Sequence, residues 1–235
     1  RFLTSLYGEM EQRLDGLITV SHSFKTYLSR YTSNPERIRV IPNGFDERRF
    51  RPVARDNAVP QFITVCRHVP AKGLDVLLAA CAELKKRGHP FMLHLIGDGP
   101  IRPDLERMTV ELNIYEETCF YGYMLHPEQF MPFFDIFVLP SRAEAFGSVF
   151  AEAALCRLAL VGTDVGGIAE QIENGVTGIL VPVDDVNALA DAMERLVTDP
   201  DYRNKLAEAA WLKAKRTYSL GRAVEQLKNV YESYA

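Results

Sequence analysis

The chain has 235 residues, enough to bury a substantial hydrophobic core in one or two domains. Hydrophobic residues make up 47% of it and charged residues 25%, as in ordinary globular proteins, and 27 basic side chains against 31 acidic ones leave a formal net charge of −4. This balance excludes a strongly basic, nucleic-acid-binding protein, and no apolar run reaches the roughly 20 residues that a membrane-spanning helix needs.

Two features of the sequence bear on its cellular context. Four cysteines lie in apolar segments without a Cys-x-x-Cys pair, which predicts buried free thiols in a reducing, cytoplasmic compartment; they are Cys66, Cys81, Cys119 and Cys156. The chain begins with RFLTSLYGEM, which has neither an initiator methionine nor a signal-peptide pattern. We therefore expect a fragment of a longer protein, or a numbering that starts inside one.

The first 60 residues predict short, separate elements. A strand at 15–20 is expected between two helices, and the second helix begins after Ser21, a favourable N-cap. Another short apolar run at 38–41 ends in a Pro-Asn-Gly turn. Residues 37–55 carry six arginines with acids interleaved, a pattern that favours a solvated linker over a surface facing a partner domain or an anion.

From residue 61 onward, strands and helices alternate regularly. Apolar strands at 61–67 and 91–97 are each followed by a helical pattern, at 74–88 and 103–113, and four more strands follow as TCFYG, DIFVLP, RLALVG and TGILVP. The alternation predicts an α/β fold, a doubly wound, Rossmann-like parallel sheet with helices on both faces. Such sheets bind ligands outside the carboxyl ends of their strands. The last 50 residues predict three helices.

The segment SRAEAFGSVFAEA at 141–153 carries the strongest polar signal. It follows an apolar strand, places Glu144 in a loop and Glu152 eight positions later, and has Gly147 near the start of a helix rich in alanine. The first N–H groups of a helix lack internal partners and its dipole is positive there, so such a turn suits phosphate oxygens or sugar hydroxyls. On spacing alone, an amphipathic helix with two solvated acids explains the pattern equally well.

Two other strand-to-helix loops carry candidate ligand groups. Arg67 and Lys72 share the loop after the strand at 61–67, and two cations there suit a diphosphate, although two surface cations would look the same. Gly166 and Gly167 allow a close backbone approach, either to a ligand or to a neighbouring turn.

Several common site motifs are absent from the sequence. Arg102 stands where a dinucleotide-binding fingerprint begun at Gly97 would need its third glycine, and no phosphate-binding P-loop occurs. His68, His94 and His126 have no metal-ligand spacing, so we expect no metal site. No nucleophile–base pattern is recognisable either.

The chain resembles the C-terminal, donor-binding domain of a GT-B glycosyltransferase, and in particular family four of the retaining nucleotide-sugar enzymes (glycosyl transferases group 1). The matching segments occur in family order over nearly the whole chain. They are IPNGFD at 41–46, CRHVPAKGLDVLLAA at 66–80, LIGDGP at 95–100, FYGYM at 120–124, FVLPSRAEAFGSVFAEA at 137–153 and TDVGGIAEQIENGVTGILVPVDD at 163–185. Glu144 and Glu152 meet the Glu-x7-Glu signature of that family.

The resemblance implies a set of site residues. Arg67 and Lys72 would hold the donor diphosphate, and Glu144 would contact the transferred sugar. These three are the expected catalytic residues, and no metal or other cofactor is required. Expected substrate-binding positions are the ribose ligand Glu152, backbone that frames the base near Met124, backbone that contacts the sugar at Phe146 and Gly147, and Gly99, Ser148 and Val149.

The resemblance also implies a domain division. Residues 1–57 would be a remnant of the acceptor-binding N-terminal domain plus a linker, residues 58–218 the nucleotide-sugar-binding domain, and residues 219–235 a C-terminal crossover helix. Most of the N-terminal domain, with its glycine-rich loop, has no counterpart here. Two smaller departures are Cys66 for a common glycine, and Arg157 and Ala159 where the family often has glycine and proline.

We therefore expect the donor-binding half of a hexosyltransferase that acts on a glycan, lipid or small-molecule acceptor and is inactive without the rest of the enzyme. Its partners would be a nucleotide sugar and the missing acceptor domain, with cytoplasmic location and peripheral membrane contact through that domain, and no nucleic acid. The alternative is a non-catalytic nucleotide-binding subunit that serves a separate acceptor-binding chain. A nucleotide-sugar epimerase ranks last, because it needs an acid/base set that the sequence does not show.

Overall fold

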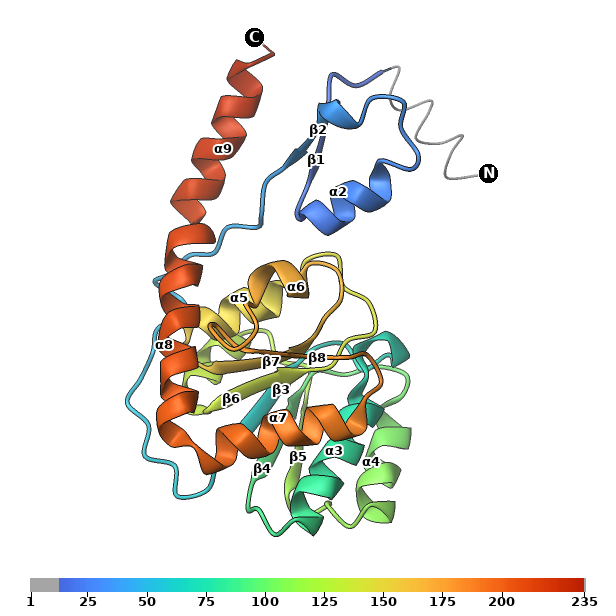
Figure 1. Cartoon of the computed structure of the whole chain (residues 1–235), viewed down its shortest axis with the longest axis vertical. Coiled ribbons are helices and arrows are strands. Elements are labelled where there is room, and N and C mark those ends of the chain that lie inside the picture. Colours follow the sequence, from blue (N-terminus) through green and yellow to red (C-terminus); the bar gives the residue numbers. More distant parts are fainter. Residues whose placement is uncertain (1–12, 235) are drawn as a thin grey trace.

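The computed structural model describes residues 13–234 and shows a small lobe above a larger one (Figure 1). The helix expected at the start of the chain lies mostly outside the described residues. In the small lobe, the parallel strands β1 (Leu17–Thr19) and β2 (Ile38–Val40) pair in register, and helix α2 (His22–Leu28) connects them. Ser21 caps α2 as predicted, since its side chain accepts a hydrogen bond from the N–H of Phe24 at 3.1 Å.

The large lobe is built on a six-stranded, all-parallel sheet. Its strands run in the order β5-β4-β3-β6-β7-β8. They are β3 (Gln61–Val65), β4 (Met92–Ile96), β5 (Thr118–Gly122), β6 (Ile136–Leu139), β7 (Ala159–Thr163) and β8 (Ile179–Val181). All six expected strands are present, and the order is the doubly wound one, in which the chain moves outward in one direction and then returns to β3 to build the other half. The predicted fold class is confirmed.

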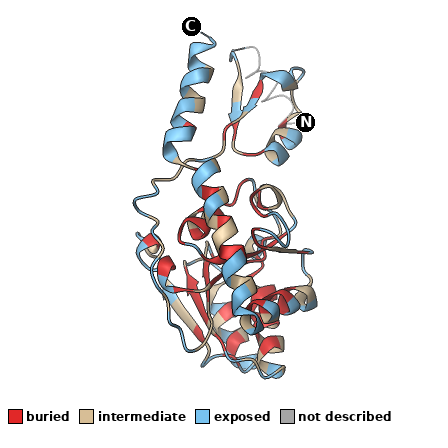
Figure 2. Ribbon diagram, turned by 60° about the vertical axis from the view of Figure 1, so that its left-hand side comes forward, coloured by how far each residue is buried: buried red, intermediate tan, exposed pale blue. Residues whose placement is uncertain are grey.

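Helices cover both faces of this sheet (Figure 1). Helices α3, α4 and α7 lie on one side, α5 and α6 lie on the other, and α8 contacts both α5 and β7. Their bounds are α3 Leu74–Lys86, α4 Arg102–Glu111, α5 Ser148–Leu155, α6 Ile168–Gln171, α7 Val186–Thr198 and α8 Pro200–Thr217. Buried residues concentrate in the sheet and on the inner faces of these helices (Figure 2).

Small side chains bring α5 close to the sheet. Ala151, Ala153 and Ala154 are buried, and the Phe150 ring packs edge-on against Phe137 of β6 with ring centroids 5.0 Å apart. Each residue of β6 is buried, so this strand lies at the centre of the core. Close packing here fixes the start of α5 relative to the end of β6.

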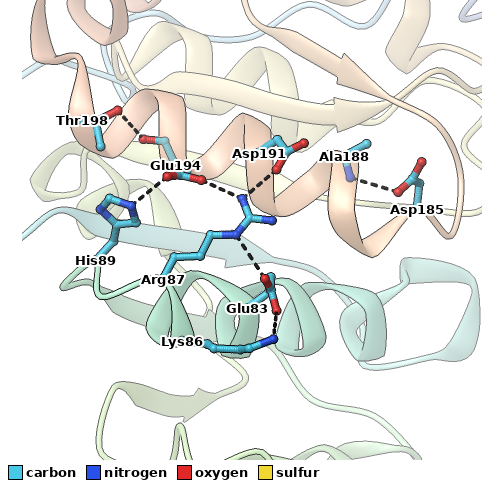
Figure 3. A network of polar contacts seen from close by, with 9 residues as sticks. All are labelled: Glu83, Lys86, Arg87, His89, Asp185, Ala188, Asp191, Glu194 and Thr198. Carbon is cyan, nitrogen blue, oxygen red and sulfur yellow. Dashed lines mark hydrogen bonds and ion pairs between the residues drawn. The ribbon is translucent and has the colours of Figure 1, made fainter.

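An ionic network joins α3 to α7 on the outer surface (Figure 3). The Arg87 guanidinium contacts Asp191 and Glu194, each at 2.6 Å, and Glu83 at 3.2 Å. His89 Nε2 lies 2.8 Å from a Glu194 oxygen. Within this network each charged group has an opposite or hydrogen-bonding partner.

The arginine-rich linker is less solvated than its composition predicts. Arg48 pairs locally with Asp46, but Arg49 forms an ion pair with the buried Glu128 at 2.5 Å. Arg55 donates hydrogen bonds to backbone carbonyls of the large lobe. The expectation of a solvated linker is therefore wrong for Arg55, because carbonyl acceptors from distant segments lie along its path, whereas Arg49 stays exposed beside its partner.

Helix α9 (Leu220–Glu232) leaves the large lobe after α8 and rises beside the small lobe (Figures 1 and 2). Val224 and Tyr231 on it are exposed, at 54% and 70% of their full surface. Of the four cysteines, Cys81 and Cys156 are buried, the other two are half-buried, and all four are free thiols. Within residues 13–234, the helices are too short or too polar to cross a bilayer.

Candidate functional site at the sheet switch point

In doubly wound sheets the ligand crevice lies where the strand order reverses, which here is between the loops that follow β3 and β6. These strands are neighbours, and the chain leaves them in opposite directions. Arg67 and Lys72 come from the loop after β3 and Glu144 from the loop after β6, so the topology places the three residues expected to be catalytic on the loops of neighbouring strands.

Lys72 and Glu144 form an ion pair across this crevice. Their side chains are only 19% and 16% exposed, so each charge is removed from most of its water and needs the other. The sequence assigned them to different parts of the ligand, and nothing in it indicated this pairing. The Arg67 side chain is exposed and makes no hydrogen bond or ion pair with the residues that the structure describes.

Close backbone contacts hold the loops of this edge together. Gly73 has φ of +64°, and a Cβ atom there would lie 2.1 Å from the carbonyl oxygen of Pro140, at the end of β6. A Cβ atom on Gly99 would lie 2.2 Å from the His68 carbonyl oxygen. Gly99, expected as a substrate-binding position, therefore joins the loop after β4 to the loop after β3.

The Gly166–Gly167 pair approaches a neighbouring turn, one of the two interpretations left open by the sequence. A Cβ atom on Gly166 would lie 1.8 Å from the Glu144 carbonyl oxygen. The N–H of Gly167 donates to that same oxygen at 3.1 Å. The two glycines thus support the backbone on which Glu144 stands.

The N-terminus of α5 faces the crevice with free donors. Gly147 is the N-cap residue, with φ of +78° and no capping side chain, and the N–H groups of Ser148 and Val149 have no partner within residues 13–234. Phe146 is buried, and its carbonyl accepts a hydrogen bond from the Gln171 side chain, which orients this turn. Unpaired N–H groups at the positive end of a helix form a ready anion site.

Glu152 lies one turn further along α5, and its carboxyl group has no partner among the described residues. Burial raises the pKa of Glu152 to about 7, the Glu128 charge adds to the rise, and Arg49 opposes it. A half-buried carboxyl without a partner is costly for the fold, and such groups concentrate at functional sites. Sequence reasoning found Glu152 but missed Glu128 and Arg49, because both approach it from distant loops.

Met124 lies away from this group. It follows β5 at the edge of the sheet, so β4 and β3 separate it from β6 and the Glu144 loop. Its side chain is half-buried against the core. The structure therefore pairs Lys72 with Glu144, places Arg67 and the start of α5 on the segments that follow β3 and β6, and leaves Met124 at the flank.

The small lobe contributes residues to the site that the sequence did not reveal. Glu170 accepts hydrogen bonds from the first N–H groups of α2, at His22 (2.9 Å) and Ser23 (2.6 Å). Ser21 Oγ donates to the Ala145 carbonyl at 2.5 Å. A hollow of about 440 Å³ lies between α2 and the Glu144 loop, and Phe24 is part of its wall.

The charges available at this edge favour an anionic ligand without indicating a metal. Among residues 13–234, no three histidine, cysteine or acidic side chains gather as metal ligands would. Positive charge comes instead from Arg67, Lys72 and the α5 dipole. These groups lie at the switch point of a doubly wound α/β domain.

Comparison with known proteins agrees with this class. The family model of the glycosyl transferases group 1 matches residues 45–212, and the chain belongs to that family. An α-D-kanosaminyltransferase of Streptomyces kanamyceticus is 38% identical over 176 residues, which cover 73% of this chain and 45% of that enzyme. The chain spans about half the length of the curated relatives that it matches.

Solved glycosyltransferase structures share the GT-B fold of this chain. Sucrose-phosphate synthase of Thermosynechococcus elongatus superposes with a TM-score of 0.86 at 28% identity, covering 94% of this chain and 58% of that one. An Anabaena protein crystallised with UDP and glucose gives a TM-score of 0.88 at 22% identity, covering 98% of this chain and 66% of that one. These similarities correspond to the C-terminal part of a GT-B glycosyltransferase.

Proposed function

We propose that this chain is the donor-binding part of a retaining glycosyltransferase that moves a hexose-type sugar from a nucleoside diphosphate to a glycan, lipid or small-molecule acceptor. Membership of the family supports the transferase class. The observation that carries the proposal is the crevice at the switch point, where Lys72, Glu144, the exposed Arg67 and the free N–H groups of α5 meet. Cations and a carboxylate side by side suit a ligand that joins a diphosphate to a polyol.

In this proposal the donor diphosphate lies between Arg67, Lys72 and the start of α5. Arg67 forks onto two oxygens, and the N–H groups of Ser148 and Val149 donate to the phosphate nearest the helix. Charge builds up on the diphosphate as its bond to the sugar breaks, and these donors stabilise that charge. They do so without needing a metal or another cofactor.

The sugar and the ribose would occupy opposite ends of the same turn. Glu144 accepts hydrogen bonds from sugar hydroxyls, together with backbone groups of Phe146 and Gly147. Glu152 accepts from the ribose hydroxyls, which supplies the partner that its carboxyl group lacks in the ligand-free fold. The base extends past Gly99 toward the backbone near Met124.

Binding of the donor changes the ion pair at the centre of the site. Before the donor binds, Lys72 pairs with Glu144. When the donor is bound, Lys72 contacts the doubly charged diphosphate instead, and sugar hydroxyls donate hydrogen bonds to Glu144. The ion pair therefore holds both side chains, before binding, close to the positions from which they contact the donor. This positioning reduces the ordering that the ligand must impose.

We also propose that the 235-residue chain alone binds the donor without transferring its sugar. The small lobe closes only part of the crevice through α2, and the acceptor is held by the part of the family architecture that these residues do not contain. We place the boundaries of the donor domain at residues 58 and 218, with α9 crossing to the acceptor domain. Free thiols support a cytoplasmic location, with any membrane contact made by the acceptor domain.

Calorimetric titration tests the donor site. Replacing Arg67 and Lys72 together by alanine should weaken binding of nucleoside diphosphates about a hundredfold or more, since each charge-assisted hydrogen bond contributes about 1.5–3 kcal/mol. Binding of the uncharged nucleoside should change little. As a matched control, alanine at Lys86 and Arg87 removes two cations from the α3–α7 network and should leave affinity unchanged. Equal losses for nucleoside and diphosphate would contradict the proposal.

A further inference from the structure

A polar hollow of about 420 Å³ lies at the opposite end of the large sheet from the donor site. Its walls come from residues 53–57 of the linker, from Asp135 and Arg157 just before β6 and β7, and from the first turns of α8. The volume lies within the range of small-molecule sites, about 300–1,000 Å³. The residues assigned to donor binding play no part in it.

Three arginines from three separate segments converge on this hollow: Arg55, Arg157 and Arg203. Arg157 has an acidic partner, Glu208, at 2.5 Å. Arg55 and Arg203 contact only carbonyl oxygens, and neither forms an ion pair with another described residue. Burial lowers the pKa of Arg55 and the charge of Asp135 opposes this fall, while the charges of Arg157 and Arg203 add to it. The hollow thus holds two guanidinium groups, those of Arg55 and Arg203, that form no ion pair within residues 13–234.

Two acidic side chains, Asp56 and Asp135, also line the hollow. The Asp135 carboxylate already accepts hydrogen bonds from the Asn57 amide at 3.0 Å and the Gln61 N–H at 2.9 Å. Asp56 is exposed to solvent. The amide groups of Asn57 and Asn204 add neutral hydrogen-bonding groups to the rim. The lining therefore combines three arginines with two aspartates and two asparagine amides.

The backbone of Arg157 points to a role for its side chain. This residue sits in the left-handed region with φ of 60°, in the tight turn between α5 and β7. Glycine adopts that conformation without cost, whereas a residue with a Cβ atom is strained there. The turn itself does not require an arginine, and the guanidinium group at this position pairs with Glu208 and lines the hollow.

We propose that this hollow is a second ligand site, which binds a phosphate monoester that also carries hydroxyl groups. The guanidinium forks of Arg157 and Arg203 hold the phosphate oxygens, with Arg55 beneath them, and the asparagine amides contact the hydroxyls. Since Arg55 and Asn57 belong to the linker between the lobes, an occupant fastens that linker to the sheet. The site is independent of the proposed transfer reaction.

This site can be tested by calorimetry on the full chain in which the two cations of the proposed donor site are replaced. In the Arg67→Ala/Lys72→Ala variant, inorganic phosphate should still bind at one site, and glycerol 3-phosphate should bind there more tightly. In that background, Arg203→Gln or Arg157→Gly should weaken phosphate binding at least about tenfold. Arg107→Gln, which removes an exposed cation on α4, should leave it unchanged.

The Arg157→Gly variant separates loss of binding from loss of folding. Glycine relieves the strained turn, so this variant should melt no lower than its parent while it loses phosphate affinity. Absence of phosphate binding in the Arg67→Ala/Lys72→Ala chain, or unchanged affinity in both Arg203→Gln and Arg157→Gly, would overturn the site. Equal affinity for phosphate and glycerol 3-phosphate would overturn the hydroxyl contacts. The donor proposal fails separately, if Arg67→Ala/Lys72→Ala removes no phosphate site from the wild-type chain.

Discussion

The donor edge and the α3–α7 network are both charged clusters, but they treat their charges in opposite ways. In the network, Arg87 contacts three carboxylates, and the pKa values of Glu83 and Glu194 are lowered by their hydrogen bonds to it (Figure 3). At the donor edge, Glu152 has no partner and burial raises its pKa to about 7. Arg67 is likewise unpaired with the described residues.

The contrast separates charges that serve the fold from charges that await a ligand. Paired surface charges join two helices, and their attraction offsets part of the free-energy cost of removing them from water. An unpaired, half-buried carboxyl destabilises the fold, and such groups concentrate at sites of binding or chemistry. Four measurements test this distinction, and they are given from the largest expected effect to the smallest.

The largest effect is expected where the donor edge depends on close backbone contact. Gly73→Ala places a Cβ atom 2.1 Å from the Pro140 carbonyl oxygen at a φ of +64°, and should lower the free energy of unfolding by about 3 kcal/mol or more. Gly88→Ala is the matched control, because Gly88 has φ of +85° but no atom within 4 Å of its added Cβ. It should cost only about 1 kcal/mol. Urea denaturation measures both, and equal losses would show that the contact between the β3 and β6 loops is unimportant.

The second effect concerns how much the buried Glu152 carboxyl lowers the free energy of unfolding. Its pKa is raised in the folded chain from 4.5 to about 7, so the folded state holds the proton more tightly than the unfolded state does. Stability should therefore fall as the pH rises from 4.5 to 7, and Glu152→Gln should remove this loss. We expect the variant to be more stable than the wild type by roughly 1–3 kcal/mol at pH 8 and no more stable at pH 4. A difference of the same size at both pH values would mean that ionisation of Glu152 is not its cause.

The third effect tests what compensates Glu152 in the working protein. At pH 8, Glu152→Gln should weaken binding of a nucleoside diphosphate about tenfold, because a charged acceptor of the ribose hydroxyls is lost. The loss should largely vanish for the 2′,3′-dideoxy analogue, as a double-mutant cycle by calorimetry would show. A penalty that is the same for both nucleotides would make Glu152 a structural residue.

The smallest effect is expected in the α3–α7 network. Glu83 and Glu194 have lowered pKa values in the folded chain, so their pairing with Arg87 stabilises the fold above the pKa of the unfolded chain. That contribution is lost as the pH falls through the lowered values. Arg87→Gln should therefore reduce Tm slightly at pH 7, less in high salt, and not at all in strong acid. Nucleotide affinity should be unaffected, and a marked loss of affinity would remove the distinction between the two clusters.

The fold of the large lobe could be predicted from local pattern. Alternating apolar strands and amphipathic helices define a doubly wound sheet, and the six strands formed where the pattern indicated. Ser21 capped its helix for an equally local reason. The contacts of the linker could not be predicted from local pattern, because Arg49 and Arg55 each contact a residue 79 positions away in sequence.

The sequence by itself determined the class of fold, the family, and which side chains stand at strand ends, because periodicity, turn residues and motif spacing are short-range properties. Only the tertiary structure decided how those side chains pair. Lys72 and Glu144 are 72 positions apart and meet because β3 and β6 are neighbours in the sheet. Glu170 reaches the start of α2 across 148 positions. The order of the strands brings these residues together. That order depends on the packing of the whole core, and no local sequence pattern encodes such packing.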